Sequence, residues 1–318
     1  MTLSAEHVAD IAHRFDLGDD PVVNGQPARG EQGQVWRVTS SRGTFAVKEM
    51  FGAWTEDEVR VAADYQDAVT AAGVHVPRII RTTDGHVLFD GGDGRPLIRV
   101  YAWTDLRDPD PRLDPAEVGR TVAAIHRVHQ PDPGPVHPWY TEPVGAAHWD
   151  ELRAAALEQG APFAADLERS RDELVALETL HSTPTNLQLC HSDLWADNLR
   201  STPDGAPCVI DWENTGAADP AQELGLVLYE FGGADSDRVR SIYRAYVDAG
   251  GPFRIARPSD FWMLAAQLMH ITARAVELWV APDAADEQRR HYAALFGEFI
   301  ERPLTLALVE SMLTAIHD

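Results

Sequence analysis

Residues 186–214 read NLQLCHSDLWADNLRSTPDGAPCVIDWEN and interrupt a region whose periodicity otherwise predicts helices. The apolar runs at 187–190, 199–201 and 208–212 predict three short strands. A polar loop joins the first two strands, and the turn 202–207, which contains Pro-Asp-Gly, joins the last two into a hairpin. The segment is therefore expected to hold polar side chains between short buried strands.

The polar residues of this segment suggest chemistry. Asp193 and Asn198 lie five residues apart on the loop, and Asp211 ends the last strand, so the hairpin can bring Asp211 beside Asn198. A carboxylate and an amide oxygen are hard ligands suited to Mg²⁺ held on nucleotide phosphates. Asp193, outside that pair, can accept a proton from an attacking hydroxyl. Each residue alone is also common in turns, so the interpretation depends on their combination.

The basic residues single out one position. They comprise 26 Arg and a single Lys, Lys48. An ammonium is a compact point charge on a flexible stem, whereas a guanidinium is a planar fork, so a narrow site can accept one and reject the other. Lys48 lies on the second strand of a hairpin predicted at 35–39 and 44–50, and Gly30 and Gly33 come just before the first strand.

The N-terminal third predicts a small α+β lobe around this hairpin. Helices are expected at 4–15 and 55–72, the second with acidic residues in its first turn. Two further strands are expected at 86–89 and 96–101, on either side of the turn DGGDG. A loop rich in Gly, Asp and Pro is expected between the first helix and the segment ARGEQGQV.

The remainder of the chain predicts mainly helices. The Asp- and Pro-rich segment DLRDPDPRLDP reads as a connector, so we expect a lobe at 1–103 and a helical lobe at 104–318. The last helical range is expected to hold more than one helix. The expected helices are 115–129, 145–159, 161–181, 219–231, 236–249, 259–280 and 284–316.

Composition excludes several classes of protein. Fifty acidic against 27 basic residues among 318 leave a formal charge of −23, which argues against binding nucleic acid or an anionic membrane. Two cysteines rule out a disulfide scaffold and a four-thiolate zinc site. The N-terminus carries Glu6 and Asp10 and does not read as a secretory signal. The most apolar stretch, 261–280, contains Arg274 and Glu277 and is not a membrane span, so a cytoplasmic protein is expected.

These motifs, in their order along the chain, resemble those of the protein-kinase-like phosphotransferases, most closely the aminoglycoside phosphotransferase and choline kinase group. HSDLWADN is similar to the catalytic loop of that group, and VIDWE to its metal-binding segment. Asp219-Pro220 is similar to the Asp-Pro turn that opens its next helix. The resemblance implies an α+β fold of two lobes, a small β-rich N-terminal lobe and a larger, mainly helical C-terminal lobe.

The resemblance also implies roles for the residues of the catalytic segment. Asp193 would be the catalytic base, and Asn198 and Asp211 would bind Mg²⁺. The chain shows no activation loop ending in Ala-Pro-Glu, which argues against a protein substrate. A small-molecule kinase that uses ATP and Mg²⁺ is therefore expected.

The remaining implied roles concern ATP. Lys48 would bind the α- and β-phosphates, and a helix glutamate would orient it; Glu58 is favoured, with Glu56 as the alternative. The glycine loop, GEQGQV, has two glycines where many kinases show three. Backbone groups of this loop would cover the phosphates, and those of the hinge would face the adenine: Gly30, Gly33, Gln34, Tyr101 and Trp103.

The sequence defines the phosphoryl acceptor less well than it defines the ATP site. An aminoglycoside or related amino sugar is the leading expectation; choline, a sugar or a hydroxy amino acid stays open, as does a nucleotide-binding adaptor without catalysis. Acidic and aromatic side chains expected to rim the helical lobe could bind a cationic acceptor, or could serve packing alone. The candidates are Trp195, Glu213, Glu230 and Glu277. The protein is expected to act as a monomer or a homodimer.

Overall fold

In the computed structural model, which describes residues 3–30, 32–92, 94–130 and 134–317, the chain forms two units. The first comprises Met1–Asp110 and Ala196–Thr215, and the second comprises Pro111–Trp195 and Gly216–Asp318. The sequence-based division after residue 103 differs from this grouping, because residues 196–215 belong with the N-terminal part.

Backbone hydrogen bonds explain why residues 196–215 join the first unit. They form the hairpin of β7 (Leu199–Ser201) and β8 (Pro207–Val209). The N–H of Arg107 donates to the carbonyl of Ser201 at 2.7 Å, and the N–H of Val209 donates to the carbonyl of His75 at 3.0 Å. The hairpin is therefore tied to the N-terminal residues on both of its strands.

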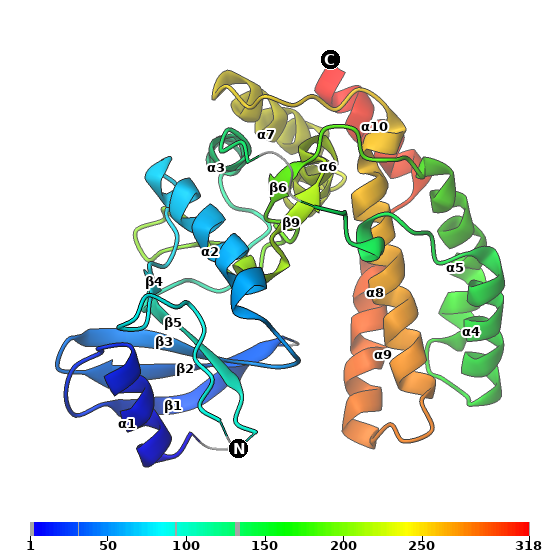
Figure 1. The fold of residues 1–318 in the computed structure, drawn as a ribbon. Coiled ribbons are helices and arrows are strands. Elements are labelled where there is room, and N and C mark those ends of the chain that lie inside the picture. Colours follow the sequence, from blue (N-terminus) through cyan, green and yellow to red (C-terminus); the bar gives the residue numbers. More distant parts are fainter. Residues whose placement is uncertain (1–2, 31, 93, 131–133, 318) are drawn as a thin grey trace. The chain divides into compact units, whose positions relative to one another are not determined.

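A five-stranded antiparallel sheet of order β1-β2-β3-β5-β4 is the centre of the first unit (Figure 1). The β2–β3 pair confirms the predicted hairpin, with Ser40 opposite Gly43 at the turn. The strands are β1 (Val22–Arg29), β2 (Gly33–Ser40), β3 (Gly43–Met50), β4 (Ile79–Ile80) and β5 (Leu97–Ala102).

One helix lies against each face of this sheet. Helix α1 (Ala5–Arg14) belongs to the same buried apolar cluster as Val47 of β3, and α2 (Glu56–Ala71) packs with Ile79 of β4. Successive side chains of a strand point to opposite faces. Lys48 therefore points to the face that α2 covers, away from the cluster that contains Val47.

Two elements of the first unit differ from the sequence prediction. Strand β1 was expected as a loop. It is an edge strand that pairs with β2 alone and has a bulge between Asn24 and Ala28. Edge strands and bulges tolerate Pro and Gly, which explains why this segment did not read as a strand. The strand expected at 86–89 forms only one bridge, at Phe89. There the Glu56 carboxylate accepts the N–H groups of residues 87 and 88, which a neighbouring strand would otherwise bind.

The second unit is mainly helical, as predicted, with one two-stranded sheet of β6 (Gln188–Cys190) and β9 (Gly216–Ala218). The last predicted helical range is indeed two helices. The α-helices are α3 (Pro115–His126), α4 (Ala146–Glu158), α5 (Ala164–Leu177), α6 (Pro220–Gly232), α7 (Ser236–Asp248), α8 (Trp262–Val280), α9 (Asp286–Glu301) and α10 (Leu306–His317). The 3-10 helices of the two units are η1 (Pro138–Tyr140), η2 (Glu178–Leu180), η3 (Trp212–Asn214) and η4 (Pro258–Phe261).

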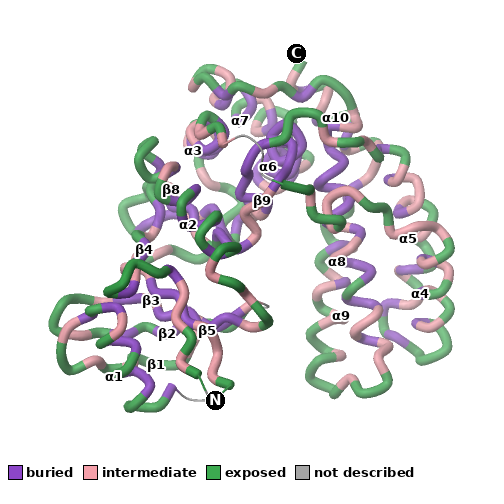
Figure 2. The backbone as a smooth tube through the Cα atoms, viewed as in Figure 1, coloured by how far each residue is buried: buried purple, intermediate pink, exposed green. Residues whose placement is uncertain are grey.

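Helix α6 is the most deeply buried helix of the second unit. Figure 2 shows it purple along almost its whole length, and Glu230 alone among its residues is not fully buried. Asp219 caps its N-terminus and accepts the N–H of Ala221, and Pro220 occupies the first turn, where it costs no hydrogen bond. The Asp-Pro pair noted in the sequence therefore starts the helix on which the catalytic loop rests.

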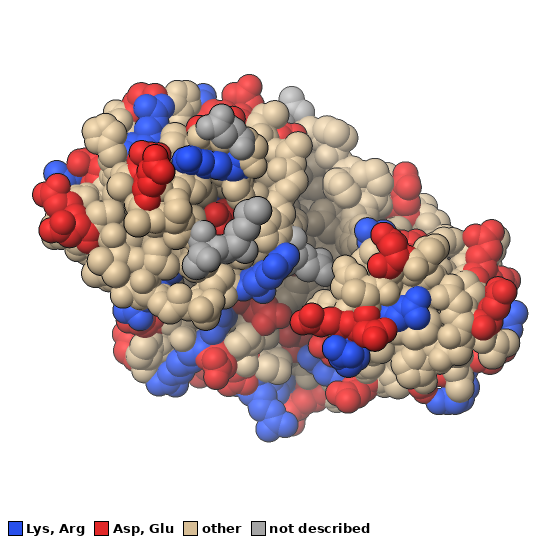
Figure 3. Space-filling model, turned by 90° about the horizontal axis from the view of Figure 1, so that it is seen from below, with Lys and Arg blue, Asp and Glu red and all other residues tan. Residues whose placement is uncertain are grey.

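The surface carries the acidic surplus that the composition indicated. Figure 3 shows acidic side chains (red) spread over the visible face and interleaved with basic ones (blue). Many are paired with arginine, as Asp150 is with Arg171 at 2.9 Å. None of the helices that the structure describes is long and apolar enough to span a bilayer.

Candidate active site

The side chain of Lys48 lies among opposite charges beneath α2. Its register partner on β5 is Arg99, and both are buried, with 7% and 1% of their surface exposed. The Glu213 carboxylate contacts both cations: Oε2 lies 3.0 Å from Lys48 Nζ, and Oε1 lies 3.1 Å from Arg99 Nη1. One anion therefore offsets two cations that would otherwise repel each other across the strands.

The protonation of this cluster follows from its contacts. Burial lowers the pKa of Lys48, but the charges of Glu213 and Asp211 outweigh that effect and hold the pKa above its usual value. Burial raises the pKa of Glu213, yet the Lys48 and Arg99 charges hold it well below its usual range. The Tyr101 hydroxyl donates to the Glu213 carboxylate at 3.2 Å. The cluster is therefore an ammonium and a guanidinium held by a carboxylate.

Asp211 is the second carboxylate bound to Lys48. Its Oδ1 lies 2.7 Å from Lys48 Nζ, and its side chain keeps 42% of its surface exposed. The backbone at Asp211 is left-handed, with φ 61°, which is uncommon outside glycine and clusters at functional sites. Although part of the side chain is exposed, burial of its carboxyl group beneath the surrounding residues and the nearby Glu213 charge raise its pKa. A cation bound at this carboxylate would relieve that cost.

The hairpin brings Asn198 close to Asp211, as the sequence predicted. Leu199 pairs with Val209, and the N–H of Ile210 donates to the Asn198 carbonyl at 2.9 Å. Asn198 is 8% exposed. The two proposed metal ligands thus flank the end of one two-stranded ladder within the first unit.

The turn after Asp211 is anchored by an aromatic side chain. Trp212 is 1% exposed, its Nε1 donates to the Val209 carbonyl at 3.2 Å, and its ring meets that of Tyr65 of α2 edge to face at 5.8 Å. Because Trp212 is fixed on one side, Glu213 turns inward toward Lys48. Of the two residues that follow Asp211, Trp212 thus has a packing role and Glu213 an ionic role.

The glycine turn lies between β1 and β2. Gly30 N donates to Gly33 O at 2.9 Å, and a Cβ at Gly33 would come within 2.4 Å of the Glu49 carbonyl and 3.4 Å of Lys48 Cε. Gly33 therefore permits the close approach of β3. Gln34 was expected to contribute its backbone; its side chain donates to the Glu49 carboxylate. Residue 31 of this expected loop lies outside the described residues.

The two expected hinge residues have other contacts. Tyr101 pairs with Ala46 and Ile79 on its two sides. The N–H of Trp103 donates to the Thr44 carbonyl at 3.0 Å, and its indole donates to Asp105 at 2.8 Å. An adenine contact through the Trp103 N–H would have to replace a bond inside the sheet. The adenine-facing role of these residues stays a prediction.

The helix glutamate expected to orient Lys48 requires a correction. Glu58 caps α2, where its carboxylate accepts the backbone N–H of Thr55 at 2.9 Å and the Thr55 hydroxyl at 2.7 Å. Glu56 binds the backbone at Val87 and Leu88. Among the described residues, the carboxylates within ion-pair distance of Lys48 are Asp211 and Glu213. A Thr-x-x-Glu pattern before a helix is a capping box, and this signal was already in the sequence.

Two of the expected acceptor residues are also corrected. Glu213 is enclosed by Lys48 and Arg99 in the first unit, so it is not a surface carboxylate of the helical lobe. Glu230 has a side chain that is only 10% exposed, and its Oε2 lies 3.2 Å from Arg302 Nη1. Both carboxylates are largely buried and paired with arginine or lysine, so neither is available to an acceptor amine.

The catalytic loop begins in the second unit, where its backbone is held on both sides. Ser192 is left-handed, with φ 66°, and directly precedes Asp193. Its N–H donates to Glu223 Oε1 of α6 at 2.5 Å, and its carbonyl accepts Gln267 Nε2 of α8 at 3.1 Å. The same Gln267 accepts the indole N–H of Trp195 at 3.3 Å. Asp193 is therefore flanked by residues anchored to two helices.

A buried network supports Glu223. Its Oε2 lies 2.8 Å from His126 Nε2, and His126 Nδ1 lies 3.0 Å from the Tyr246 hydroxyl. That hydroxyl accepts the N–H of Phe253 at 3.2 Å, so its proton is free to go to His126 Nδ1. This arrangement assigns the Nε2 proton of His126 to the bond with Glu223. The roles of Glu223 and Gln267 were not predicted, because the residues of this network come together only in the tertiary structure.

Asp193 has an aromatic neighbour in the same unit. Burial, followed by the negative charges of Asp193 and Glu223, raises the pKa of Tyr140 in η1. Tyr140 packs on the cluster of Cys190, Ala218 and Met263. The hydroxyl of Tyr140 therefore stays protonated beside the carboxylate of the catalytic loop.

Comparison with known proteins places these observations in a family. A family described as "Phosphotransferase enzyme family" matches residues 25–257. The viomycin phosphotransferase of Streptomyces vinaceus is 32% identical over 118 residues, which are 35% of this chain and 40% of that protein. The match thus spans less than half the length of that relative.

Solved structures show the same fold. An aminoglycoside phosphotransferase from Alicyclobacillus acidocaldarius has a TM-score of 0.67 at 18% identity, covering 100% of this chain and 97% of its own. A spectinomycin phosphotransferase in complex with ADP and spectinomycin has a TM-score of 0.67 at 13% identity, covering 98% and 97%. A choline/ethanolamine kinase family protein from Mesorhizobium loti has a TM-score of 0.56 at 19% identity, covering 99% of each chain.

These likenesses confirm the protein-kinase-like fold, with its sheet-containing N-terminal part and its mainly helical C-terminal part. The matched range includes the glycine turn, Lys48, Asp193 and Asp211. The chain belongs to the phosphotransferase enzyme family that contains the aminoglycoside phosphotransferases.

Proposed function

We propose that this protein transfers the γ-phosphoryl group of ATP to a hydroxyl group of a small molecule. The observation that carries the proposal is the ammonium of Lys48, 2.7 Å from Asp211 and 3.0 Å from Glu213. Phosphoryl transfer depends on positioning and on neutralising phosphate charge. The one lysine of a chain with a charge of −23 is held by carboxylates next to a left-handed turn, which is the environment expected of a phosphate-binding cation.

The side chains around Asp211 fit Mg²⁺. Asp211 and Asn198 offer a carboxylate and an amide oxygen, and Mg²⁺ in kinases is bound by one or two such groups together with substrate phosphates. The described residues contain no group of three or more His, Cys, Asp and Glu side chains that could hold a metal. A site that shares its ion with ATP does not need such a group. When bound, Mg²⁺ would neutralise charge on the phosphates.

Asp193 is proposed as the base. As the acceptor oxygen bonds to the γ-phosphorus, its proton passes to the Asp193 carboxylate, and the bond to the β-phosphate oxygen breaks to release ADP. The rigid setting of Ser192, bound by Glu223 and Gln267, supports this role because a base must be positioned before it can accept the proton.

The acceptor is proposed to carry amino groups. Proteins similar to this chain are named for viomycin and spectinomycin, and others for choline or ethanolamine. We place an aminoglycoside or related amino sugar first and a smaller amino alcohol second. A cytoplasmic location, where ATP is available, is part of the same proposal.

A coupled assay of ADP release tests the function. Purified protein is given Mg-ATP and a panel of amine-bearing and sugar acceptors, and the wild type is compared with Asp193→Asn. We expect acceptor-dependent ADP release by the wild type and a loss of about 10²–10⁴-fold in the variant. Tight Mg-ATP binding with no turnover of any acceptor would favour an adaptor over an enzyme.

A further inference from the structure

A hydrogen bond joins the glycine turn to the segment that carries Asp211. Nε2 of Gln32, which lies between Gly30 and Gly33, donates to Oδ1 of Asn214 at 2.8 Å, although the two residues are 182 positions apart in the chain. Asn214 ends η3, which begins directly after Asp211. Both residues belong to the first unit. This bond, the Gln32–Asn214 clamp, therefore connects the turn expected to cover the phosphates with the turn expected to bind the metal.

The backbone of Gln32 is fixed as well. Its carbonyl accepts the N–H of Phe51, the residue after β3, at 2.8 Å, and Gly30 N donates to Gly33 O at 2.9 Å. Gly33 lies against the stem of Lys48, since a Cβ at Gly33 would come within 3.4 Å of Lys48 Cε. The side chain of Gln32 thus starts from a turn held against Lys48 and reaches the segment that binds the Lys48 ammonium.

These contacts form a closed circuit that includes Lys48. Directly before Asn214 in the chain is Glu213, whose Oε2 lies 3.0 Å from Lys48 Nζ. Strand β3 leads from Lys48 to Phe51, and Gln32 closes the circuit through its backbone bond to Phe51 and its side-chain bond to Asn214. The glycine turn, the lysine and the carboxylate turn are therefore tied to one another by bonds of the protein itself.

Such a tie has a use in phosphate binding. Successive backbone N–H groups of a turn form a concave site for an anion, and phosphoryl transfer depends on positioning the phosphate groups. Ordering a free turn costs conformational entropy, which reduces the affinity for the ligand that orders it. A turn that Gln32 already holds has lost this freedom, so the phosphates are bound without that cost.

The second polar atom of the Gln32 amide has no bond within the protein. Oε1 is buried and lacks a hydrogen-bond partner among the residues that the structure describes. A buried acceptor without a partner costs free energy, and such atoms mark places where a water molecule or a ligand completes the site. A water molecule held between ATP and the protein is a donor that fits this atom.

We propose that Gln32 is a positioning residue for the phosphates of ATP, which acts through Asn214 by holding the glycine turn to the segment of Asp211. The inference rests on the proposed function, because it concerns the phosphate groups of that reaction. It predicts that the clamp strengthens the binding of nucleotides through their phosphates and makes no difference to adenosine, which has none.

Nucleotide titration tests the clamp without requiring turnover. The full chain is titrated with Mg-ATP by calorimetry and with adenosine by ligand-observed NMR, which detects weak binding. The variants are Gln32→Ala, Asn214→Ala and the double variant, and urea unfolding checks that each is folded. Asn24→Ala is the matched control, since Asn24 near the start of β1 makes a side-chain bond of the same length, 2.8 Å, to Thr39 of β2.

We expect Gln32→Ala to weaken Mg-ATP binding about threefold to tenfold, which corresponds to the loss of one hydrogen bond. Adenosine affinity should stay within about twofold of the wild type, because the clamp does not act on the base or the ribose. Asn214→Ala should also weaken Mg-ATP binding. The double variant should bind no more weakly than the weaker single variant, since both substitutions remove the same bond. Asn24→Ala should leave the Mg-ATP affinity unchanged.

Three results would overturn the clamp. One is an Mg-ATP affinity that Gln32→Ala leaves unchanged in a folded variant. Another is an equal loss of adenosine affinity, because the substitution would then disturb the sheet and not the phosphate site. The third is a double variant in which the two single losses multiply, because the two side chains would then act separately.

The proposed function can fail independently of the clamp. A wild type that binds Mg-ATP, with variants that behave as expected but with no acceptor-dependent ADP release, would contradict the proposed function and leave the clamp standing. A wild type that binds no Mg-ATP would overturn both.

Discussion

Lys48 and Arg99 face each other directly across β3 and β5, and one carboxylate, that of Glu213, joins them. The pairing makes the proposed phosphate-binding cation part of a buried ionic unit. Because Glu213 comes from the turn after Asp211, the sheet and the hairpin β7–β8 depend on each other for charge balance.

Glu213→Gln should destabilise the protein. The substitution keeps the shape of the side chain but leaves the buried Arg99 without its anion and Lys48 with Asp211 alone, and breaking a buried pair costs about 3–5 kcal/mol. Urea unfolding measures the change. Glu58→Gln, which only weakens the cap of α2, should lower the free energy of unfolding much less. If Glu58→Gln were the more damaging of the two, or if it alone abolished ATP binding, Glu58 and not Glu213 would be the carboxylate that Lys48 depends on.

Lys48→Arg should lose ATP affinity although it keeps the charge. The Nζ atom lies between two carboxylates at 2.7 and 3.0 Å, and its Cε passes close to Gly33, so a planar guanidinium has no room. Titration with Mg-ATP measures the affinity, and circular dichroism checks the fold. An unchanged dissociation constant in a folded variant would contradict the argument for a point charge.

Asp211→Ala and Asp193→Ala should fail in different ways. Removing Asp211 takes away a proposed Mg²⁺ ligand, so nucleotide binding should lose its dependence on the metal and weaken. Removing Asp193 should spare Mg-ATP binding and lower kcat by about 10²–10⁴-fold. Binding with and without Mg²⁺, together with turnover, separates the two. Equal effects on binding would mean that the two roles are wrongly assigned.

Glu223→Gln should lower kcat while nucleotide affinity stays unchanged. The amide can still accept the Ser192 N–H, but it disturbs the bond with His126 and so shifts the residue before Asp193. A misplacement of about 1 Å can cost up to about 10²-fold in rate. The kcat and KM values for ATP are measured together, because a purely structural role would lower the amount of folded enzyme without changing kcat per folded molecule.

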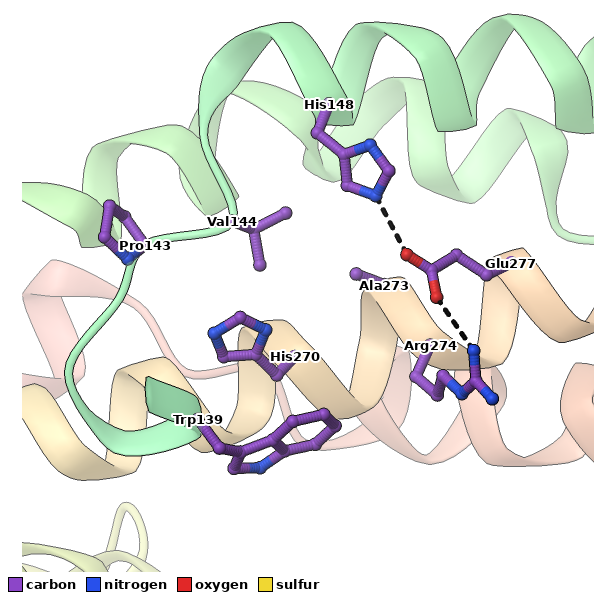
Figure 4. Close-up of a pocket in the computed structure, with 8 residues that line it drawn as sticks. All are labelled: Trp139, Pro143, Val144, His148, His270, Ala273, Arg274 and Glu277. Atoms are coloured by element: carbon purple, nitrogen blue, oxygen red, sulfur yellow. Dashed lines mark hydrogen bonds and ion pairs between the residues drawn. The ribbon is translucent and has the colours of Figure 1, made fainter. Parts of the chain in front are cut away.

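His148 should give the stability a small dependence on pH. The Glu277 carboxylate raises the pKa of His148 above the 6.5 of a free histidine, and Glu151 adds to this. The raised pKa means that the pair stabilises the fold fully below pH 6.5 and that this stabilisation is lost as the pH rises through the folded-state value. Since His148 is exposed, the effect should be under about 1 kcal/mol. Urea unfolding between pH 6 and 9 should show it in the wild type and not in His148→Gln. Arg274, 3.3 Å from Glu277, is a further charged group of this cluster (Figure 4).

Local patterns in the sequence were sufficient for most of the elements. The hairpin that carries Lys48, the capped helix at Thr55 and the mainly helical second unit are confirmed, because periodicity, capping and turn residues act within a few positions of the chain. Strands with weak local patterns were missed, namely β1, β4 and β9. They form because a partner strand is available, which no local pattern reports.

The sequence also predicted which residue types would lie near Lys48, but it did not predict which of their side chains form ion pairs. The sequence alone determined that a single lysine, a loop aspartate and a strand-end aspartate would be present in this order. Only the tertiary structure decided that Glu213, and not Glu58, neutralises Lys48, that Arg99 shares this carboxylate, and that Glu223 holds Ser192. Long-range ion pairs depend on which strands and turns meet in space, and a charge acts on whatever lies within a few ångströms, however far away it is along the chain.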